Sequence, residues 1–256
     1  MTGRPYILFE TNWKAVKGTD FEVAVLPWGA VEAHNYHLPY GTDVLQSDYI
    51  AAESARIAWE KGIKVIVLPA VPYGVNTGQM DIKLDVNIYP GTQAAILRDI
   101  SQSLFHQGFR KLVVLNGHGG NDFKPIIREI QAAYPEMFLC LINWYQALKQ
   151  EHFFKDLGEH GGEMETSNIM VISPDWMLPL EEAGNGRARP FKLRGLREGL
   201  AWAQRDWPKA TEDTGIGNPA EATAEKGRRY LDALTTAIGS FFIDLAGADL
   251  KHLYQA

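Results

Sequence analysis

The sequence is short of cysteine, of long apolar runs and of positive charge. Cys140 is its single cysteine and cannot form a disulfide within the chain. No apolar stretch reaches the roughly 20 residues that span a bilayer, and the N-terminal residues turn polar too early for a secretory signal. The formal net charge of −6 argues against a nucleic-acid surface. These absences predict a soluble cytoplasmic protein that binds neither membranes nor nucleic acid.

Short apolar runs alternate with segments of helical periodicity through the first 143 residues. The apolar runs are 21–27, 63–68, 111–115 and 137–142, and the helical segments between them are 44–61, 92–108 and 123–133. This alternation predicts a three-layer αβα fold of the α/β class, with a mostly parallel central sheet. The pattern weakens after Trp144, apart from a possible helix over 161–172 and a long helix over 219–246. No linker interrupts the chain, so we expect one domain over residues 1–256.

The stretch Leu112–Asn121 has the pattern of a buried strand that ends in a glycine-flanked histidine, His118. Open α/β sheets hold their ligands at the carboxyl ends of their strands, which is where His118 is expected. An ordinary strand-to-helix turn with an incidental histidine explains this stretch equally well. Other parts of the chain must decide between the two interpretations.

Further carboxylates and histidines occur at two other loop positions. The loop over residues 28–42, which leads to Asp43, contains Glu32 and His34, and residues 159–167 add His160 with three glutamates. A loop this long inside a compact domain commonly has a function. Mixed histidine and carboxylate sets bind divalent metals, and a carboxylate can bridge two of them. Solvated loop residues that never meet are the alternative, but their shared position favours a metal centre.

Four segments resemble the motifs of the creatininase (creatinine amidohydrolase) family, in the same order along the chain. The resemblance covers about residues 20–175, and the segments that carry it are Leu26–Asp43, Tyr89–Thr92, Leu115–Asn121 and His160–Ser167. It implies an αβα fold with two divalent metal ions per chain (Zn, Mn or Fe) and hydrolysis of a cyclic or non-peptide C–N amide bond in a small molecule. It also implies a homo-oligomer, possibly a hexamer.

The resemblance also implies a set of metal ligands. Glu32 and His118 would hold one metal and His34 the other, with Asp43 bridging them. Creatininase takes its fifth ligand, a glutamate, from the position two residues after the histidine of the Asn-Gly-His turn. That position is Gly120 in this chain. Two nearby glutamates could replace it, and we put Glu163 first, with Glu165 as the second choice.

His160 matches the histidine that transfers a proton in the family. A metal-bridging hydroxide would attack the carbonyl carbon of the amide, since metals lower the pKa of bound water. His160 would then pass a proton to the leaving nitrogen, and Glu165 could orient its imidazole. His37 is expected to order the loop rather than to take part in catalysis.

Departures from the creatininase pattern make creatinine an unexpected substrate. The tryptophan that stacks on the substrate ring in creatininase is replaced by Asp156, and a substrate-contacting tyrosine is replaced by Gly119. We therefore expect Gly119, Trp144 and Tyr145 to line the substrate site, although the end of an apolar strand would also place aromatic residues at 144 and 145.

Two other functions remain open for the same fold. One is a formamido-pyrimidine deformylase or a small-peptide peptidase that uses the same dinuclear centre. The other is a metal-free binding protein, which is disfavoured because every expected ligand position carries a competent side chain.

Overall fold

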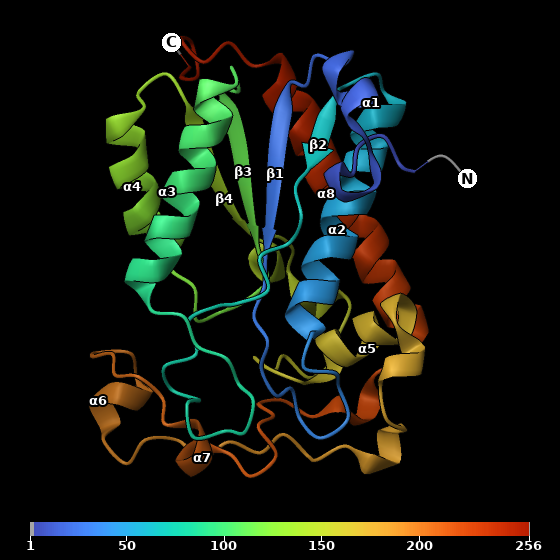
Figure 1. The fold of residues 1–256 in the computed structure, drawn as a ribbon. Helices are drawn as coiled ribbons and strands as arrows, with labels where there is room; N and C mark the ends of the chain where they lie inside the picture. Colours follow the sequence, from blue (N-terminus) through green and yellow to red (C-terminus); the bar gives the residue numbers. More distant parts are fainter. Residues whose placement is uncertain (1–2, 256) are drawn as a thin grey trace.

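A four-stranded parallel sheet lies at the centre of the computed structural model, which describes residues 3–255 (Figure 1). Its order is β2-β1-β3-β4, and the strands are β1 (Val23–Trp28), β2 (Val65–Val67), β3 (Lys111–Asn116) and β4 (Phe138–Asn143). All six residues of β1 are buried, because helices cover both faces of the sheet. The predicted α/β fold with a parallel sheet is confirmed, and each strand lies within two residues of the expected bounds.

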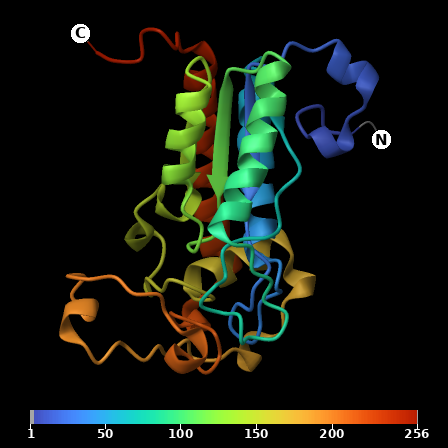
Figure 2. The ribbon, with the colours of Figure 1, turned by 60° about the vertical axis from the view of Figure 1, so that its left-hand side comes forward.

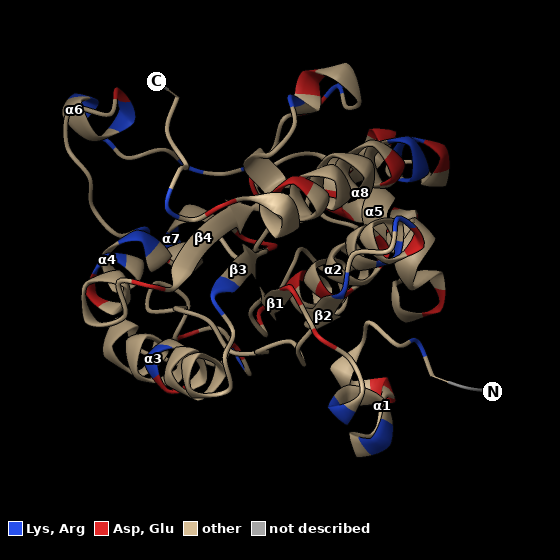
Figure 3. Ribbon diagram, turned by 90° about the horizontal axis from the view of Figure 1, so that it is seen from above, with Lys and Arg blue, Asp and Glu red and all other residues tan. Residues whose placement is uncertain are grey.

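Helices form the two outer layers (Figure 3). One layer contains α3 (Pro90–His106) and α4 (Phe123–Ala133), and the other contains α2 (Thr42–Glu60) and α8 (Ala224–Gly247), with α5 (Glu163–Ile172) packed against α8. Alternate residues of each strand enter different halves of the core. Val23 and Val25 pack on the α2/α8 side, whereas Ala24 and Leu26 pack on the α3/α4 side.

Two helix details differ from the prediction. Helix α3 begins at Pro90, two residues before the predicted start at residue 92, and Tyr89 is its N-cap. Proline is well suited to this first position, where its missing N–H would have no helical partner. Helix α8 begins at Ala224, five residues after the predicted start at residue 219, and Thr223 is its N-cap.

The long segment between α5 and α8, residues 173–223, passes beneath the carboxyl ends of the strands and is called the excursion below (Figures 1 and 2). It contains only short helices, among them α6 (Arg194–Arg197) and α7 (Trp207–Ala210). Backbone hydrogen bonds between Ile216 and His160, at 2.7 and 3.0 Å, attach it to the body of the protein. The excursion therefore covers the edge of the sheet at which a site was predicted.

The remaining helices are short. They are α1 (Trp13–Lys17) and the 3-10 turns η1 (Leu8–Glu10), η2 (Trp144–Gln146), η3 (Gln150–His152), η4 (Pro174–Trp176), η5 (Leu180–Glu182) and η6 (Pro219–Glu221). Within residues 3–255, no helix is both long enough and apolar enough to cross a membrane.

Candidate metal centre

The loops that follow β1 and β3 bring the predicted ligands to one place. Glu32 and His34 come from the loop after β1, and Asp43 lies in the first turn of α2. The loop approaches α2 closely at Gly29, where a Cβ would lie 2.7 Å from the backbone nitrogen of Val44. Only glycine permits this approach, which places the β1 loop beside the N-terminus of α2.

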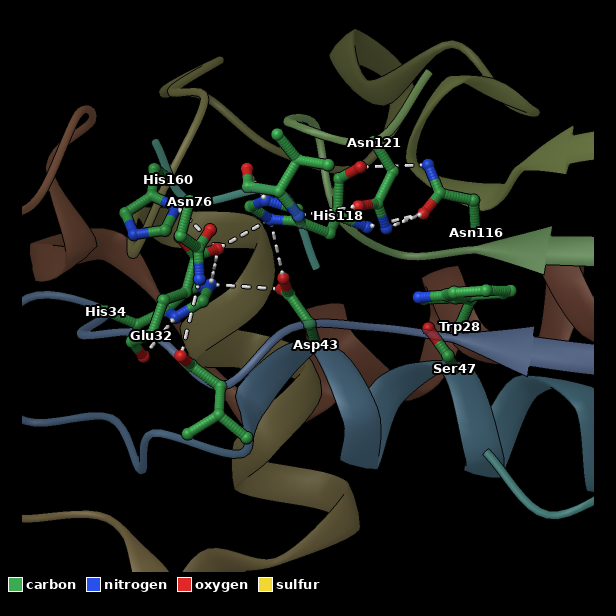
Figure 4. Close-up of polar contacts among 12 residues, drawn as sticks. Trp28, Glu32, His34, Asp43, Ser47, Asn76, Asn116, His118, Asn121 and His160 are labelled. Atoms are coloured by element: carbon green, nitrogen blue, oxygen red, sulfur yellow. Dashed lines mark hydrogen bonds and ion pairs between the residues drawn. The ribbon is translucent and has the colours of Figure 1, made fainter. Parts of the chain in front are cut away.

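His118 is fixed by the turn that ends β3. The side chain of Asn116 accepts a hydrogen bond from the His118 backbone N–H (3.1 Å) and donates one to its carbonyl oxygen (2.9 Å), as Figure 4 shows. Asn121 donates a further hydrogen bond to the same Asn116 side chain at 2.9 Å. This amide network holds the imidazole over the end of the sheet, so the predicted strand-end histidine points into the site.

Asp43 joins two groups of ligand atoms. Its Oδ2 lies 3.1 Å from His118 Nδ1, and its Oδ1 lies 3.0 Å from His34 Nε2. Glu32 Oε1 completes the first group at 2.8 Å from His118 Nδ1, and Glu165 Oε1 completes the second at 3.7 Å from His34 Nε2. Within each group the ligand atoms lie within 4.8 Å of one another. Asp43 therefore has the position of a bridging carboxylate.

Backbone carbonyl groups fix the tautomers of both histidines. His34 Nδ1 lies 3.1 Å from the carbonyl oxygen of Glu32, and His118 Nε2 lies 3.0 Å from that of Val75. A carbonyl only accepts hydrogen bonds, so these nitrogens carry the protons and the opposite nitrogens face the carboxylates. Metal-binding histidines are usually oriented in this way.

The charge of the cluster requires compensation. Glu32, Asp43 and Glu165 are at most 7% exposed. Among residues 3–255, no lysine or arginine forms an ion pair with any of these three carboxylates. His34 Nε2 is buried and makes no well-formed hydrogen bond. Buried carboxylates are costly unless they are paired or coordinate metals, so this set of donors fits divalent cations.

The pKa shifts in the cluster follow from the same negative charge. Burial lowers the pKa of His34, but the carboxylates of Asp43 and Glu165 outweigh burial and raise it well above its ordinary value. For His118, Glu32 and Asp43 outweigh burial in the same way. Burial raises the pKa of Asp43, yet the two histidines bring it down to about 2. The cluster therefore stabilises positive charge, whether on a protonated histidine or on a bound cation.

The structure does not support Glu163 as the fifth ligand. Its carboxylate forms an ion pair with Lys226 of α8 and accepts hydrogen bonds from the backbone N–H groups of Lys155 (2.8 Å) and Asp156 (2.7 Å). Glu165 enters the cluster instead, with its second oxygen 2.6 Å from the backbone nitrogen of Gly161. The second choice, Glu165, is therefore the glutamate that the fold places beside His34 and Asp43 in the cluster.

His160 lies against the cluster, with its ring stacked on that of His34 at 3.9 Å between centroids. Its Nε2 donates to the carbonyl oxygen of Ala33 (2.8 Å), which leaves Nδ1 facing Glu32 Oε1 at 3.9 Å. Among the described residues, Glu165 makes no hydrogen bond to this imidazole, so the carbonyl of Ala33 takes the orienting role that we had given to Glu165. Burial and His34 lower the pKa of His160.

The loop over residues 72–89 contributes contacts that the sequence analysis missed. Gln79 is buried and donates a hydrogen bond to Glu32 Oε2 at 2.5 Å. Asp85 accepts a hydrogen bond from the backbone N–H of Ala33, between the candidate ligands Glu32 and His34, at 2.7 Å. Amide side chains in loops give no distinctive pattern, so only the length of this loop could have drawn attention to it.

The three predicted substrate-binding residues have different environments. Gly119 is exposed, with open space around it. Trp144 is fully buried, and its Nε1 lies 3.3 Å from Ser47 Oγ, so it is a core residue and the expectation that it lines a pocket is wrong. Tyr145 is half-buried, and burial, reinforced by the charge of Asp43, raises its pKa to about 12.

His37 hydrogen-bonds Thr166 Oγ1 at 2.9 Å, consistent with a structural role.

The parallel α/β fold and the buried cluster of histidines and carboxylates at its carboxyl edge are typical of a metal-dependent hydrolase. The chain belongs to the creatininase family, since the family model described as creatinine amidohydrolase matches residues 10–242. The resemblance stated from the motifs is thereby confirmed.

Several individual proteins resemble this chain. A Bacteroides fragilis protein of known structure has 42% identity and a TM-score of 0.92, over 96% of this chain and 98% of its own. A creatinine amidohydrolase of Pseudomonas putida is 30% identical over 60% of this chain, but the match spans only 65% of that relative. The mycofactocin precursor peptide peptidase of Mycobacterium tuberculosis is 28% identical over 82% of this chain and 80% of its own length.

Proposed function

We propose that this protein hydrolyses the C–N amide bond of a small molecule at a dinuclear metal centre. The observation that carries the proposal is the position of Asp43, which directs one oxygen to His34 and the other to His118. Glu32, His118 and Asp43 would hold one ion, and His34, Glu165 and Asp43 the other. The donor set suits Zn, Mn or Fe alike.

Two divalent ions bound here would supply an activated water and polarise the carbonyl oxygen of the substrate. The protein's own contribution to the reaction centres on His160. Its Nε2 is held by the carbonyl of Ala33, so Nδ1 is the nitrogen that faces the cluster. We assign to Nδ1 the transfer of a proton from the attacking water to the leaving nitrogen. The new C–O bond forms first, and the C–N bond then breaks as the nitrogen takes up the proton. The products are an acid and an amine, which remain in one molecule when the amide is cyclic.

A peptidase on the same centre is the second candidate. It is supported by the mycobacterial relatives, which are described as peptidases and align over most of this chain. The two candidates differ in substrate, so a panel of cyclic amides, formamides and short peptides assayed with the metal-loaded protein separates them.

The first experiment is elemental analysis of the protein purified without added metal, together with His118→Ala. About two ions per chain, with loss in the variant, would support the dinuclear centre. One ion per chain would indicate a mononuclear hydrolase. No metal, even after incubation with Zn or Mn, would refute the proposal and leave the binding-protein hypothesis.

We also infer a homo-oligomer. Large apolar side chains around α6 are strongly exposed, namely Leu193 (69%), Leu200 (86%) and Trp202 (84%). Exposed apolar groups that gather in this way often mark protein interfaces. Light scattering after size-exclusion chromatography gives the number of subunits, and a monomer would refute the inference.

A further inference from the structure

The excursion between α5 and α8 places an indole directly beside His160. Trp207, the first residue of α7, contacts the His160 ring edge-on, with 4.7 Å between centroids and 61° between planes. The ring of His34 stacks on His160 at 3.9 Å. His160 therefore lies between a metal-ligand histidine and a tryptophan from a distant part of the chain.

The position of Trp207 is fixed from two sides. Its backbone N–H donates to the carbonyl oxygen of Gly78 at 3.1 Å. The excursion fits tightly there, because a Cβ at Gly78 would lie 2.3 Å from the carbonyl oxygen of Arg205 and 3.2 Å from Trp207 Cδ1. Arg205 lies 5.1 Å from the indole centroid and forms an ion pair with Glu159 at 2.8 Å. The indole is therefore a fixed surface and not a loose surface side chain.

Trp207 also differs from the tryptophans of the core. Trp28 and Trp144 are completely buried, whereas Trp207 keeps part of its surface accessible. Trp207 therefore keeps apolar surface that a bound molecule could contact. The indole lies next to the imidazole whose Nδ1 faces the cluster.

We propose that Trp207 is the wall that contacts the leaving-group side of the substrate and selects for a flat or apolar group there. This inference rests on the proposed function. The scissile nitrogen must come within reach of His160 Nδ1. The other sides of the cluster are occupied by α2, α5, the loop over residues 72–89 and the loops after β1 and β3. A group carried on that nitrogen therefore extends past His160 and meets the indole, a large apolar surface with little conformational entropy to lose.

Two metal-binding probes test the wall without an activity assay. N-methylacetohydroxamic acid and N-phenylacetohydroxamic acid bind metals through the same oxygens and differ only in the group on nitrogen. Calorimetric titration of the metal-loaded wild type should show the N-phenyl probe binding about tenfold more tightly, which corresponds to one aromatic contact. In Trp207→Ala that preference should largely disappear, while the affinity for the N-methyl probe and the metal content stay unchanged.

Matched variants keep the test decisive. Trp176→Ala removes an exposed tryptophan from the same excursion, away from the apolar residues around α6, and should keep the wild-type preference. Trp207→Phe should retain most of it, and Trp207→Leu replaces the alanine variant if that variant does not fold. If Trp207→Ala retains its metals and still prefers the N-phenyl probe to the same degree, the role of Trp207 as a substrate contact is refuted, while the proposed metal centre is unaffected. Failure of the metal-loaded wild type to bind either probe would refute both.

Discussion

Replacing the two glutamates of α5 separately distinguishes a metal ligand from a structural ion pair. Glu165→Gln keeps the shape of the side chain but removes a negative donor from the group that contains His34 and Asp43. The group of Glu32, Asp43 and His118 does not include Glu165. We therefore expect metal content to fall from about two ions per chain to about one.

Glu163→Gln should leave the metal content unchanged and lower the stability of the fold. It keeps the metals, because the Glu163 carboxylate contacts Lys226 and two backbone N–H groups rather than the cluster. Glu163 is fully buried, and the Lys226 side chain is only 20% exposed. Breaking such a pair costs about 3 kcal/mol, at the low end for buried pairs because Lys226 keeps some contact with water. For a chain of this size that loss lowers Tm by roughly 6–12 °C.

Elemental analysis and calorimetric melting of both variants, with and without a chelator, check these expectations. The chelator separates the stability due to bound metal from that of the fold. Loss of metal in Glu163→Gln with full retention in Glu165→Gln would show that the assignment of the two side chains is reversed. A Tm of metal-free Glu163→Gln equal to that of the metal-free wild type would refute the cost assigned to the ion pair.

Three further predictions follow from the surroundings of the cluster. Gln79→Leu removes the hydrogen bond to Glu32 and should weaken metal binding about 10–100-fold in competition with a chelating dye, and unchanged affinity would contradict this role. Asp43→Asn should reduce metal content to less than one ion per chain, because both groups share this carboxylate, and retention of both ions would exclude a bridge. Burial raises the pKa of Asp85 from 3.8 to about 6, so ionisation of Asp85 destabilises the fold as pH rises through this range. In chelator-treated protein, Asp85→Asn should therefore raise Tm more at about pH 7 than at about pH 4, and an equal effect at both would contradict the shift.

Local pattern was sufficient for most of the sheet and for part of the site. The apolar runs that predicted β1 and β3 are buried on both faces, and a strand with this composition has few alternatives. His118 follows β3 directly, so its place at the sheet edge follows from the strand itself. Trp144 shows the limit of this reasoning. We expected it to line the substrate site, but its indole packs against Ser47 in the core, which agrees with the alternative that the end of an apolar strand places an aromatic residue there.

The residues that cover the site could not be predicted. Gln79 and Trp207 reach it from segments that lie far from the ligands in sequence and carry no motif. Their roles depend on how two loops meet at Gly78, and that contact is set by backbone positions rather than by local propensity.

The sequence by itself determined the order of strands and helices along the chain and the residue types that can hold metal at the ends of β1 and β3. Only the tertiary structure decided between Glu163 and Glu165. Residues two apart on an α-helix point in nearly opposite directions, about 200° around the axis, so both cannot face the cluster. Packing of α5 against α8 directs Glu163 to Lys226 and leaves Glu165 facing His34. That choice depends on a contact between segments more than 60 residues apart, which no local pattern contains.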